Sequence, residues 1–196
     1  MFEQLKQKYL KCQKCEKLCR SRTQVVFGSG NKEADVLFIG EAPGTNEDKN
    51  GIPFCGMSGK ILDQLLGSIN LLREDIFITN TILCHPEGNR NPAKDEVENC
   101  RERLDKLIKV MQPKVIVTIG NFATERIINK TGINSIRGQV FDFQGIKVVP
   151  VVHPASYLYS GRNPEMLEEM KKDFQTISKI IDVKNNKNKQ ITLDQF

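Results

Sequence analysis

Short apolar runs alternate along the chain with stretches in which apolar residues recur every three or four positions. Four of the runs are apolar almost throughout and rich in β-branched residues, and they cover residues 36–39, 76–79, 115–119 and 148–152. Runs of this kind predict strands that are buried on both faces. The helical pattern covers residues 61–69, 104–111 and 167–181. Strands that alternate with helices predict an α/β fold with a largely parallel sheet between two helical layers.

Informative residues follow all four predicted strands. The first run leads into the glycine-rich segment 40–44, which contains Glu41, and the others lead into Asn80, Asn121 and His153. In a parallel sheet, ligands bind beyond the carboxyl ends of the strands. We therefore expect a carboxylate, an amide and an imidazole to meet at one edge of the sheet. Each also has an ordinary structural explanation, such as a turn for the glycines and a cap for Asn80.

The six cysteines indicate a metal centre. They are Cys12, Cys15, Cys19, Cys55, Cys84 and Cys100. In a reducing cytosol cysteines are poor candidates for disulfides, which leaves metal binding or simple burial. The first two form a Cys-x2-Cys pair, and the last two offer a second pair. The spacing does not choose between zinc and an iron–sulfur cluster, nor which four bind, because Cys19 lies one helical turn after Cys15. Cys55 is expected to be an ordinary cysteine.

Composition narrows the class of protein. A length of 196 residues with 39% hydrophobic content fits one compact domain, which we expect to cover residues 1–182. Residues 183–196 begin with a lysine- and asparagine-rich stretch and predict a flexible basic tail. No apolar run reaches the roughly 18 residues that span a bilayer, and the first residues lack an apolar signal segment. We therefore expect a cytoplasmic protein without membrane contact. The net charge of +5 permits nucleic-acid binding without requiring it.

Five motifs occur in a fixed order along the chain. They are Gly40-Glu-Ala-Pro-Gly44, the segment 51–59 with Phe54, the segment 78–84 with Asn80, Asn89-Arg-Asn-Pro92 and His153-Pro-Ala155. In this order the chain resembles the family 4 uracil-DNA glycosylases, the iron–sulfur branch of the uracil-DNA glycosylase superfamily, over about residues 8–180. The resemblance implies a three-layer αβα fold with a central four-stranded, mainly parallel sheet. It also implies a DNA-repair enzyme that flips uracil out of DNA and hydrolyses its N-glycosidic bond. A [4Fe–4S] cluster is implied on Cys12, Cys15, Cys84 and Cys100.

The same resemblance implies a uracil pocket. Its expected residues are Gly40, Glu41, Ala42, Glu47, Phe54, Asn80 and His153. Phe54 matches the residue that stacks on uracil, and Asn80 matches the amide that accepts from N3–H and donates to O4, which excludes cytosine. Glu47 is expected to crowd the position of the thymine methyl group. His153 is the candidate donor to uracil O2, where negative charge develops.

Two carboxylates are candidates for holding the attacking water. Glu41 and Glu47 both suit this role, and the sequence does not choose between them. Ala42 stands where better-studied members of the superfamily carry a catalytic aspartate, which deepens the ambiguity. The expected catalytic set is therefore Glu41, Glu47 and His153.

The segment after His153 is longer than the family pattern. Tyr157, Leu158 or Tyr159 is expected to fill the gap left by the flipped base, with Leu158 preferred, and Arg162 is expected to contact DNA. The substrate is then uracil-containing DNA, single- or double-stranded. His85 stands where the family often has arginine, which removes one expected phosphate contact.

The last seven residues resemble a clamp-binding peptide. Gln190, Leu193 and Phe196 have the spacing by which repair proteins dock on the replication sliding clamp.

Other functions stay open at this point. A non-catalytic nucleic-acid sensor would use the same cysteines and basic surface, and a redox carrier would use the cluster. The Gly-x-Gly-x-x-Gly spacing that favours a dinucleotide is absent from the sequence after every predicted strand. Within the enzyme class, the alternative substrates are thymine opposite guanine and hypoxanthine. The pocket residues distinguish these possibilities.

Overall fold

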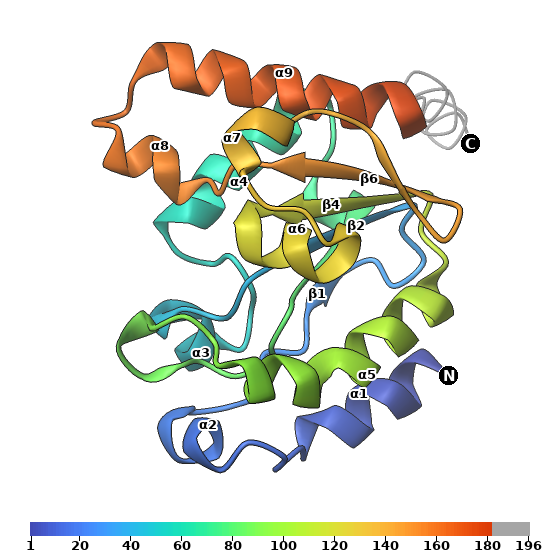
Figure 1. The fold of residues 1–196 in the computed structure, drawn as a ribbon, viewed down its shortest axis with the longest axis vertical. Helices are drawn as coiled ribbons and strands as arrows, with labels where there is room; N and C mark the ends of the chain where they lie inside the picture. Colours follow the sequence, from blue (N-terminus) through green and yellow to red (C-terminus); the bar gives the residue numbers. More distant parts are fainter. Residues whose placement is uncertain (182–196) are drawn as a thin grey trace, which may run out of the picture.

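A six-stranded sheet forms the centre of residues 1–181, the part of the chain that the computed structural model describes (Figure 1). The strands lie in the order β1-β3-β2-β4-β6-β5. Their bounds are β1 Ser29–Gly30, β2 Val36–Gly40, β3 Ile76–Asn80, β4 Val115–Ile119, β5 Phe141–Phe143 and β6 Ile146–Val151. β2, β3, β4 and β6 pair in parallel and are the four predicted strands, whereas β1 and β5 run antiparallel at the edges. The predicted count was two too low, because strands of two and three residues are too short to show a pattern.

Helices cover both faces of the sheet and give three layers (Figure 1). The α-helices are α1 Phe2–Leu10, α2 Glu16–Ser21, α3 Thr45–Asn50, α4 Met57–Gly67, α5 Lys94–Met111, α6 Gly120–Ile128, α7 Ile133–Ile136, α8 Ala155–Tyr159 and α9 Pro164–Ile181. Single 3-10 turns occupy Arg73–Asp75 and Glu87–Asn89. α4 and α9 pack on one face with α8 beside α4, and α1, α5 and α6 pack on the other. The predicted αβα arrangement is confirmed.

Each parallel strand contributes to two hydrophobic cores. In β2, Leu37 and Ile39 face the core that α1, α5 and α6 complete. Val36 and Phe38 face the opposite core, which α4 and α9 complete. Side chains of a strand alternate between the two faces of the sheet, so both sets must be apolar when both faces are covered. This is the physical reason why the strands appear in the sequence as uninterrupted apolar runs.

Polar helix surface explains the helices that the pattern missed. The expected helix at 104–111 is only the second half of α5, which begins at Lys94 rather than at the Asn91-Pro92 start that the sequence favoured. The first half of α5 exposes most of its side chains, and its start is capped by the Glu96 carboxylate, which accepts from the Ala93 N–H at 2.8 Å. α1 buries only Leu5 and Tyr9, which is too little to reveal a helix.

Some expectations fall at the limit of the described chain. No helix within residues 1–181 has the length and hydrophobicity needed to cross a membrane. The expected boundary between residues 182 and 183 and the clamp peptide with Gln190, Leu193 and Phe196 lie outside the described residues. They stay predictions.

Candidate functional site

A cavity of about 450 Å³ opens at the carboxyl ends of the parallel strands. Six of the seven expected pocket residues line it, namely Glu41, Ala42, Glu47, Phe54, Asn80 and His153. Gly40, the seventh, lies directly behind Asn80 and Phe54. The volume lies within the usual range for small-molecule sites, roughly 300–1,000 Å³. The parallel register brings the ends of β2 and β3 together, since Gly40 pairs with Asn80.

Asn80 presents an unsatisfied acceptor at the end of β3. Its side chain is only 1% exposed, and its amide oxygen Oδ1 has no hydrogen-bond partner within the described residues. A buried acceptor without a partner costs roughly 1–3 kcal/mol. A side chain at Gly40 would displace this group, because a Cβ there would lie 2.9 Å from the Phe54 ring and still closer to Asn80 Oδ1. The absence of a side chain at position 40 therefore lets the amide and the ring face one space.

Phe54 is held in an unusual backbone conformation. Its φ of 52° lies in the left-handed region, which is uncommon for a bulky residue. The guanidinium of Arg73 donates to the carbonyl oxygens of Phe54 at 2.8 Å and of Gly59 at 3.2 Å. A Cβ at Gly59 would overlap the Phe54 carbonyl oxygen. Arg73 and Gly59 together thus keep the ring of Phe54 turned into the cavity.

His153 is placed as a neutral hydrogen-bond donor. Its ring lies nearly parallel to the Phe54 ring, with 5.7 Å between centroids and 28° between planes. The Ala155 N–H donates to His153 Nδ1 at 3.1 Å, so Nδ1 is the acceptor and the neutral ring carries its proton on Nε2. Burial lowers the pKa of His153, and the charge of Glu47 opposes that shift. The imidazole is therefore neutral near pH 7.

The two cavity carboxylates differ in their surroundings. Glu47, on α3, accepts from the Gly56 N–H through Oε1 at 3.1 Å. Glu41 follows β2, and burial raises the pKa of its carboxyl group. Only the charge of Glu47 acts measurably on His153. The geometry thus distinguishes two glutamates that the sequence could not separate.

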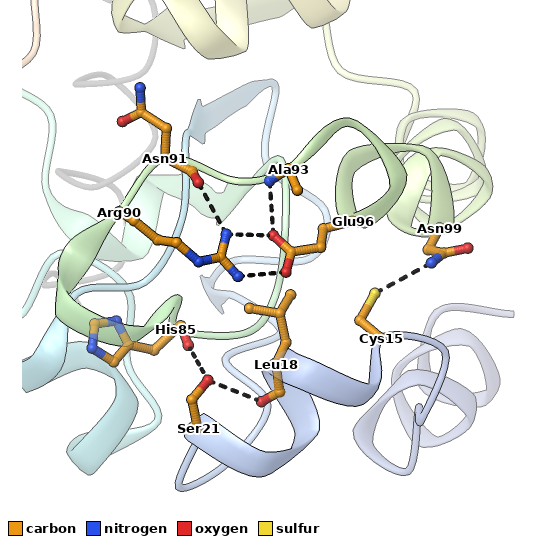
Figure 2. Close-up of polar contacts among 9 residues, drawn as sticks. All are labelled: Cys15, Leu18, Ser21, His85, Arg90, Asn91, Ala93, Glu96 and Asn99. Atoms are coloured by element: carbon orange, nitrogen blue, oxygen red, sulfur yellow. Dashed lines mark hydrogen bonds and ion pairs between the residues drawn. The ribbon is translucent and has the colours of Figure 1, made fainter.

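The loop after β3 forms one wall of the cavity and is tied down at both ends (Figure 2). Arg90 donates to both carboxylate oxygens of the buried Glu96, at 2.8 and 2.6 Å. Ser21 donates to the His85 carbonyl oxygen at 3.2 Å, which joins α2 to the same loop. His85 Nδ1 lies 3.0 Å from the carbonyl oxygen of Pro43, so this histidine links the loop to the glycine-rich segment.

The residues expected to contact DNA occupy different positions on α8 and after it. Tyr157 packs against the core formed with α4 and α9, and Leu158 is half-buried. Tyr159 is 89% exposed and lines the rim of the cavity. Arg162 is exposed in the turn between α8 and α9. Tyr159 is thus the exposed apolar ring nearest the opening.

Four cysteines converge below the cavity from three segments. Cys12 and Cys15 lie between α1 and α2, Cys84 follows β3, and Cys100 is on α5. Burial raises the pKa of Cys15 and raises that of Cys84 to about 11, and a negative charge at Cys100 raises both further. The thiols are therefore within electrostatic range of one another. Asn99 Nδ2 donates to Cys15 Sγ at 3.5 Å, which places the N-terminal segment beside α5 (Figure 2).

The cysteine arrangement is not a site for one metal ion. No three histidine, cysteine or acidic side chains of residues 1–181 form a group that could hold a single ion. Arg22 lies among the thiols, with Nη1 donating to Cys84 Sγ at 2.9 Å and Nη2 to the Cys12 carbonyl oxygen at 2.6 Å. Cys19 Sγ lies 3.8 Å from the same carbonyl oxygen, whereas Cys55 is exposed and belongs to the Phe54 loop.

Two arginines near the cavity escaped the sequence analysis. Arg73 supports the Phe54 loop, and Arg103 of α5 is 0% exposed and contacts the end of β3. The signal for Arg103 was present, because it lies three residues after Cys100 and four before Leu107, on the buried face of α5. An arginine at a core position requires partners, which makes it a candidate for function.

Comparisons with known proteins agree with this geometry. Residues 27–175 match the family described as the Uracil DNA glycosylase superfamily. The chain is 39% identical over 180 residues to a type-4 uracil-DNA glycosylase of Archaeoglobus fulgidus, which covers 87% of this chain and 88% of the relative. It is 39% identical to that of Sulfurisphaera tokodaii, covering 100% of this chain and 90% of the relative, and 39% identical to that of Saccharolobus solfataricus, covering 95% and 87%.

Proposed function

The chain belongs to the uracil-DNA glycosylase superfamily as a DNA-repair enzyme that hydrolyses the N-glycosidic bond of uracil in DNA, and we propose that the cavity beyond β2 and β3 is its uracil pocket. The observation that carries this proposal is the buried Asn80 Oδ1, which has no partner within the described residues. It faces the same space as the ring of Phe54, across the bare backbone of Gly40. A flat base with a ring N–H donor satisfies both groups at once.

Base selection follows from the polarity of the Asn80 amide. Oδ1 accepts from uracil N3–H, and Nδ2 donates to O4. Cytosine has an unprotonated N3 and an amino group at C4, so each contact would face a group of its own kind. Sites that hydrogen-bond their substrate reject an unmatched analogue strongly, because their buried polar groups are left unpaired. The exclusion of thymine by Glu47 stays a prediction.

Bond cleavage needs stabilisation of the departing uracil anion and a positioned water. His153 donates from Nε2 to uracil O2, where charge grows in the transition state. Its neutral form suffices, since a hydrogen bond to a developing anion strengthens as the charge appears. Glu47 orients the water, because its carboxylate is fixed by the Gly56 N–H and acts electrostatically on His153. Glu41 is less suited, because burial raises its pKa and favours its uncharged form.

Entry of uracil requires that the nucleotide leave the helix, at a cost of a few kcal/mol. The exposed ring of Tyr159 at the rim is suited to fill the vacated position, with Leu158 beside it and Tyr157 anchoring α8 to the core. Arg162 lies where the chain turns toward α9 and is free to approach a phosphate.

A [4Fe–4S] cluster on Cys12, Cys15, Cys84 and Cys100 fits the side chains present. The donor set is all thiol, and the irons of such a cluster each take one thiolate, so its ligands stand farther apart than those of a single ion. Two arginines supply positive charge around the thiols, Arg22 at Cys84 and the fully buried Arg103. When bound, the cluster joins the N-terminal segment to β3 and α5 and supplies anionic charge there. Iron analysis checks the ligand set: each of the four Cys→Ser variants is expected to lose iron, whereas Cys55→Ser is expected to keep it.

We extend the proposal to the tail and to the place of action. Gln190, Leu193 and Phe196 dock the enzyme on the replication sliding clamp, and the enzyme works in the cytoplasm with the chromosomal DNA. Deletion of residues 190–196 is expected to abolish clamp binding and to spare uracil excision. Equal clamp affinity after the deletion would refute the docking role.

The excision assay tests the pocket directly. The protein is incubated with oligonucleotides that contain uracil, single-stranded or paired, and free base and alkali-labile sites are measured. Oligonucleotides with hypoxanthine or with thymine opposite guanine test the alternative substrates. Asn80→Ala and His153→Ala are expected to lower the rate without loss of the brown colour of a bound cluster. Gln175→Ala, an exposed amide on α9, is the control and should match the parent. A parental rate in either pocket variant would remove that residue from the mechanism.

A further inference from the structure

Arg103 is the largest fully buried side chain of the described residues and ends at the residue that reads the base. Its Nη2 donates to the main-chain carbonyl oxygens of Asn80 at 2.6 Å and of Thr81 at 2.9 Å. Its Nη1 donates to Thr79 Oγ1 at 3.2 Å. The planar guanidinium therefore bridges three consecutive residues at the end of β3. It fixes the backbone from which the Asn80 amide projects into the cavity.

The charge of Arg103 lacks a carboxylate partner. No ion pair within residues 1–181 includes it, and its Nε has no hydrogen-bond partner there. Burial lowers the pKa of Arg103 to about 10, so the group still carries its charge near pH 7. A buried cation is strongly disfavoured unless an anion compensates it. Some nearby group must therefore be negative.

The candidates for that anion reduce to the cysteines. The charges that favour the cationic form of Arg103 belong to Cys100, Tyr9 and Cys84, while Arg126 opposes it. Burial raises the pKa of Tyr9 to about 12, so this phenol is neutral near pH 7. Cys84 and Cys100 are the two thiols on either side of the β3–α5 connection, and ligation to iron keeps such thiols deprotonated. The compensating charge thus belongs to the two cluster ligands nearest Asn80.

We propose that Arg103 is a positioning residue that makes base reading depend on the cluster. Its cation is held in the core by the ligated Cys84 and Cys100, and its fork holds the main chain of Asn80. This inference rests on the proposed function, because it assumes the cluster and the role of Asn80. It adds that the cluster acts on the uracil pocket through one side chain, besides joining segments of the fold.

The test is Arg103→Gln, with two readouts besides excision. The first is the reduction potential of the cluster, followed by spectroscopic titration of the iron-loaded protein. Loss of a nearby buried cation makes addition of an electron harder, so the potential is expected to shift to a more negative value. The second is the inhibition constant of free uracil, which reports on the pocket without DNA contacts. It is expected to rise about tenfold, because the strand end that carries Asn80 is no longer held.

Arg73→Gln is the matched control. Arg73 also donates to the carbonyl oxygen of a pocket residue, Phe54, but it is ion-paired with Asp63 and lies on the side of α4. Its loss is expected to weaken binding of free uracil several-fold and to leave the reduction potential unchanged. A merely structural arginine at position 103 would behave in the same way as this control.

The outcomes separate the two levels of the argument. Parental potential and parental uracil inhibition in iron-loaded Arg103→Gln would overturn the coupling, as would a parent protein that holds no iron. If Arg103→Gln does not fold, Arg103→Lys is measured, which keeps the charge and loses the fork. Unchanged potential with weaker uracil binding supports the coupling, and parental uracil binding overturns it. A parent that holds iron but releases no uracil would instead overturn the proposed function.

Discussion

The two sides of the uracil pocket are supported in opposite ways. Phe54 comes from a loop whose brace, Arg73, is 32% exposed in its side chain and paired with Asp63 on the surface. Asn80 comes from a strand end whose brace, Arg103, is 0% exposed and has no ion pair among the described residues. Water can replace contacts at the first side, but not at the second. The stacking side is therefore expected to tolerate damage better than the side that reads the base.

The comparison also explains where the chain stores local strain. Phe54 adopts a left-handed backbone, and the nearby Gly59 is bare enough to let its carbonyl oxygen approach. Asn80 continues a regular strand and pairs in register with Gly40. A strained loop needs close local contacts to persist, whereas a strand end needs only its charge and hydrogen bonds satisfied. The loop is thus shaped by sterics and the strand end by electrostatics.

The substitution Gly40→Ala removes the distinction between the two sides and is expected to have the largest effect. The new methyl group would press on both Asn80 Oδ1 and the Phe54 ring. Stacking is worth roughly 1–3 kcal/mol per base and a hydrogen bond about 1 kcal/mol, so loss of both lowers single-turnover excision about 100-fold or more. Gly67→Ala is the control, since a Cβ there meets nothing within 4 Å. Comparable rates for the two variants would contradict the pocket geometry.

Arg73→Gln sharpens the comparison by damaging only the solvated side. The Phe54 and Gly59 carbonyl oxygens lose a charged donor, but water can take its place. We expect kcat/KM for uracil excision to fall about fivefold and unfolding free energy to fall by about 1 kcal/mol. Urea unfolding and steady-state kinetics measure the two effects. A loss as large as that of Gly40→Ala would show that the two sides are equally sensitive.

The pH dependence of excision is the smallest expected effect and concerns the ring that stacks beside Phe54. Burial lowers the pKa of His153 below its ordinary value of about 6.5, so the neutral donor persists into mildly acidic solution. Excision should fall only as the pH drops through that lowered pKa. Because Glu47 raises the pKa, Glu47→Gln should move the acid limb of single-turnover excision to still lower pH, by a fraction of a unit. A limb that moves upward would contradict this electrostatic arrangement.

The parallel core and the location of the pocket were determined by the sequence alone. Continuous apolar runs at 36–39, 76–79, 115–119 and 148–152 occur because each strand faces two cores, so strands and sheet type follow from hydrophobicity. Parallel strands end at one edge, so Glu41, Asn80 and His153 had to meet there. These features depend on the order of residues along a strand, which a linear chain records directly.

The tertiary structure alone decided which groups support that pocket. Asn80 Oδ1 is unsatisfied because of what β2 places beside it, and Arg103 is a buried cation because α1, α5 and the cysteine segments surround it. The same holds for the order of influence between Glu41 and Glu47, which depends on their burial and on their effect on His153. Burial, dielectric and charge compensation are properties of neighbours distant in the chain. A sequence names the charged residues, but only packing determines whether water or another residue answers the charge.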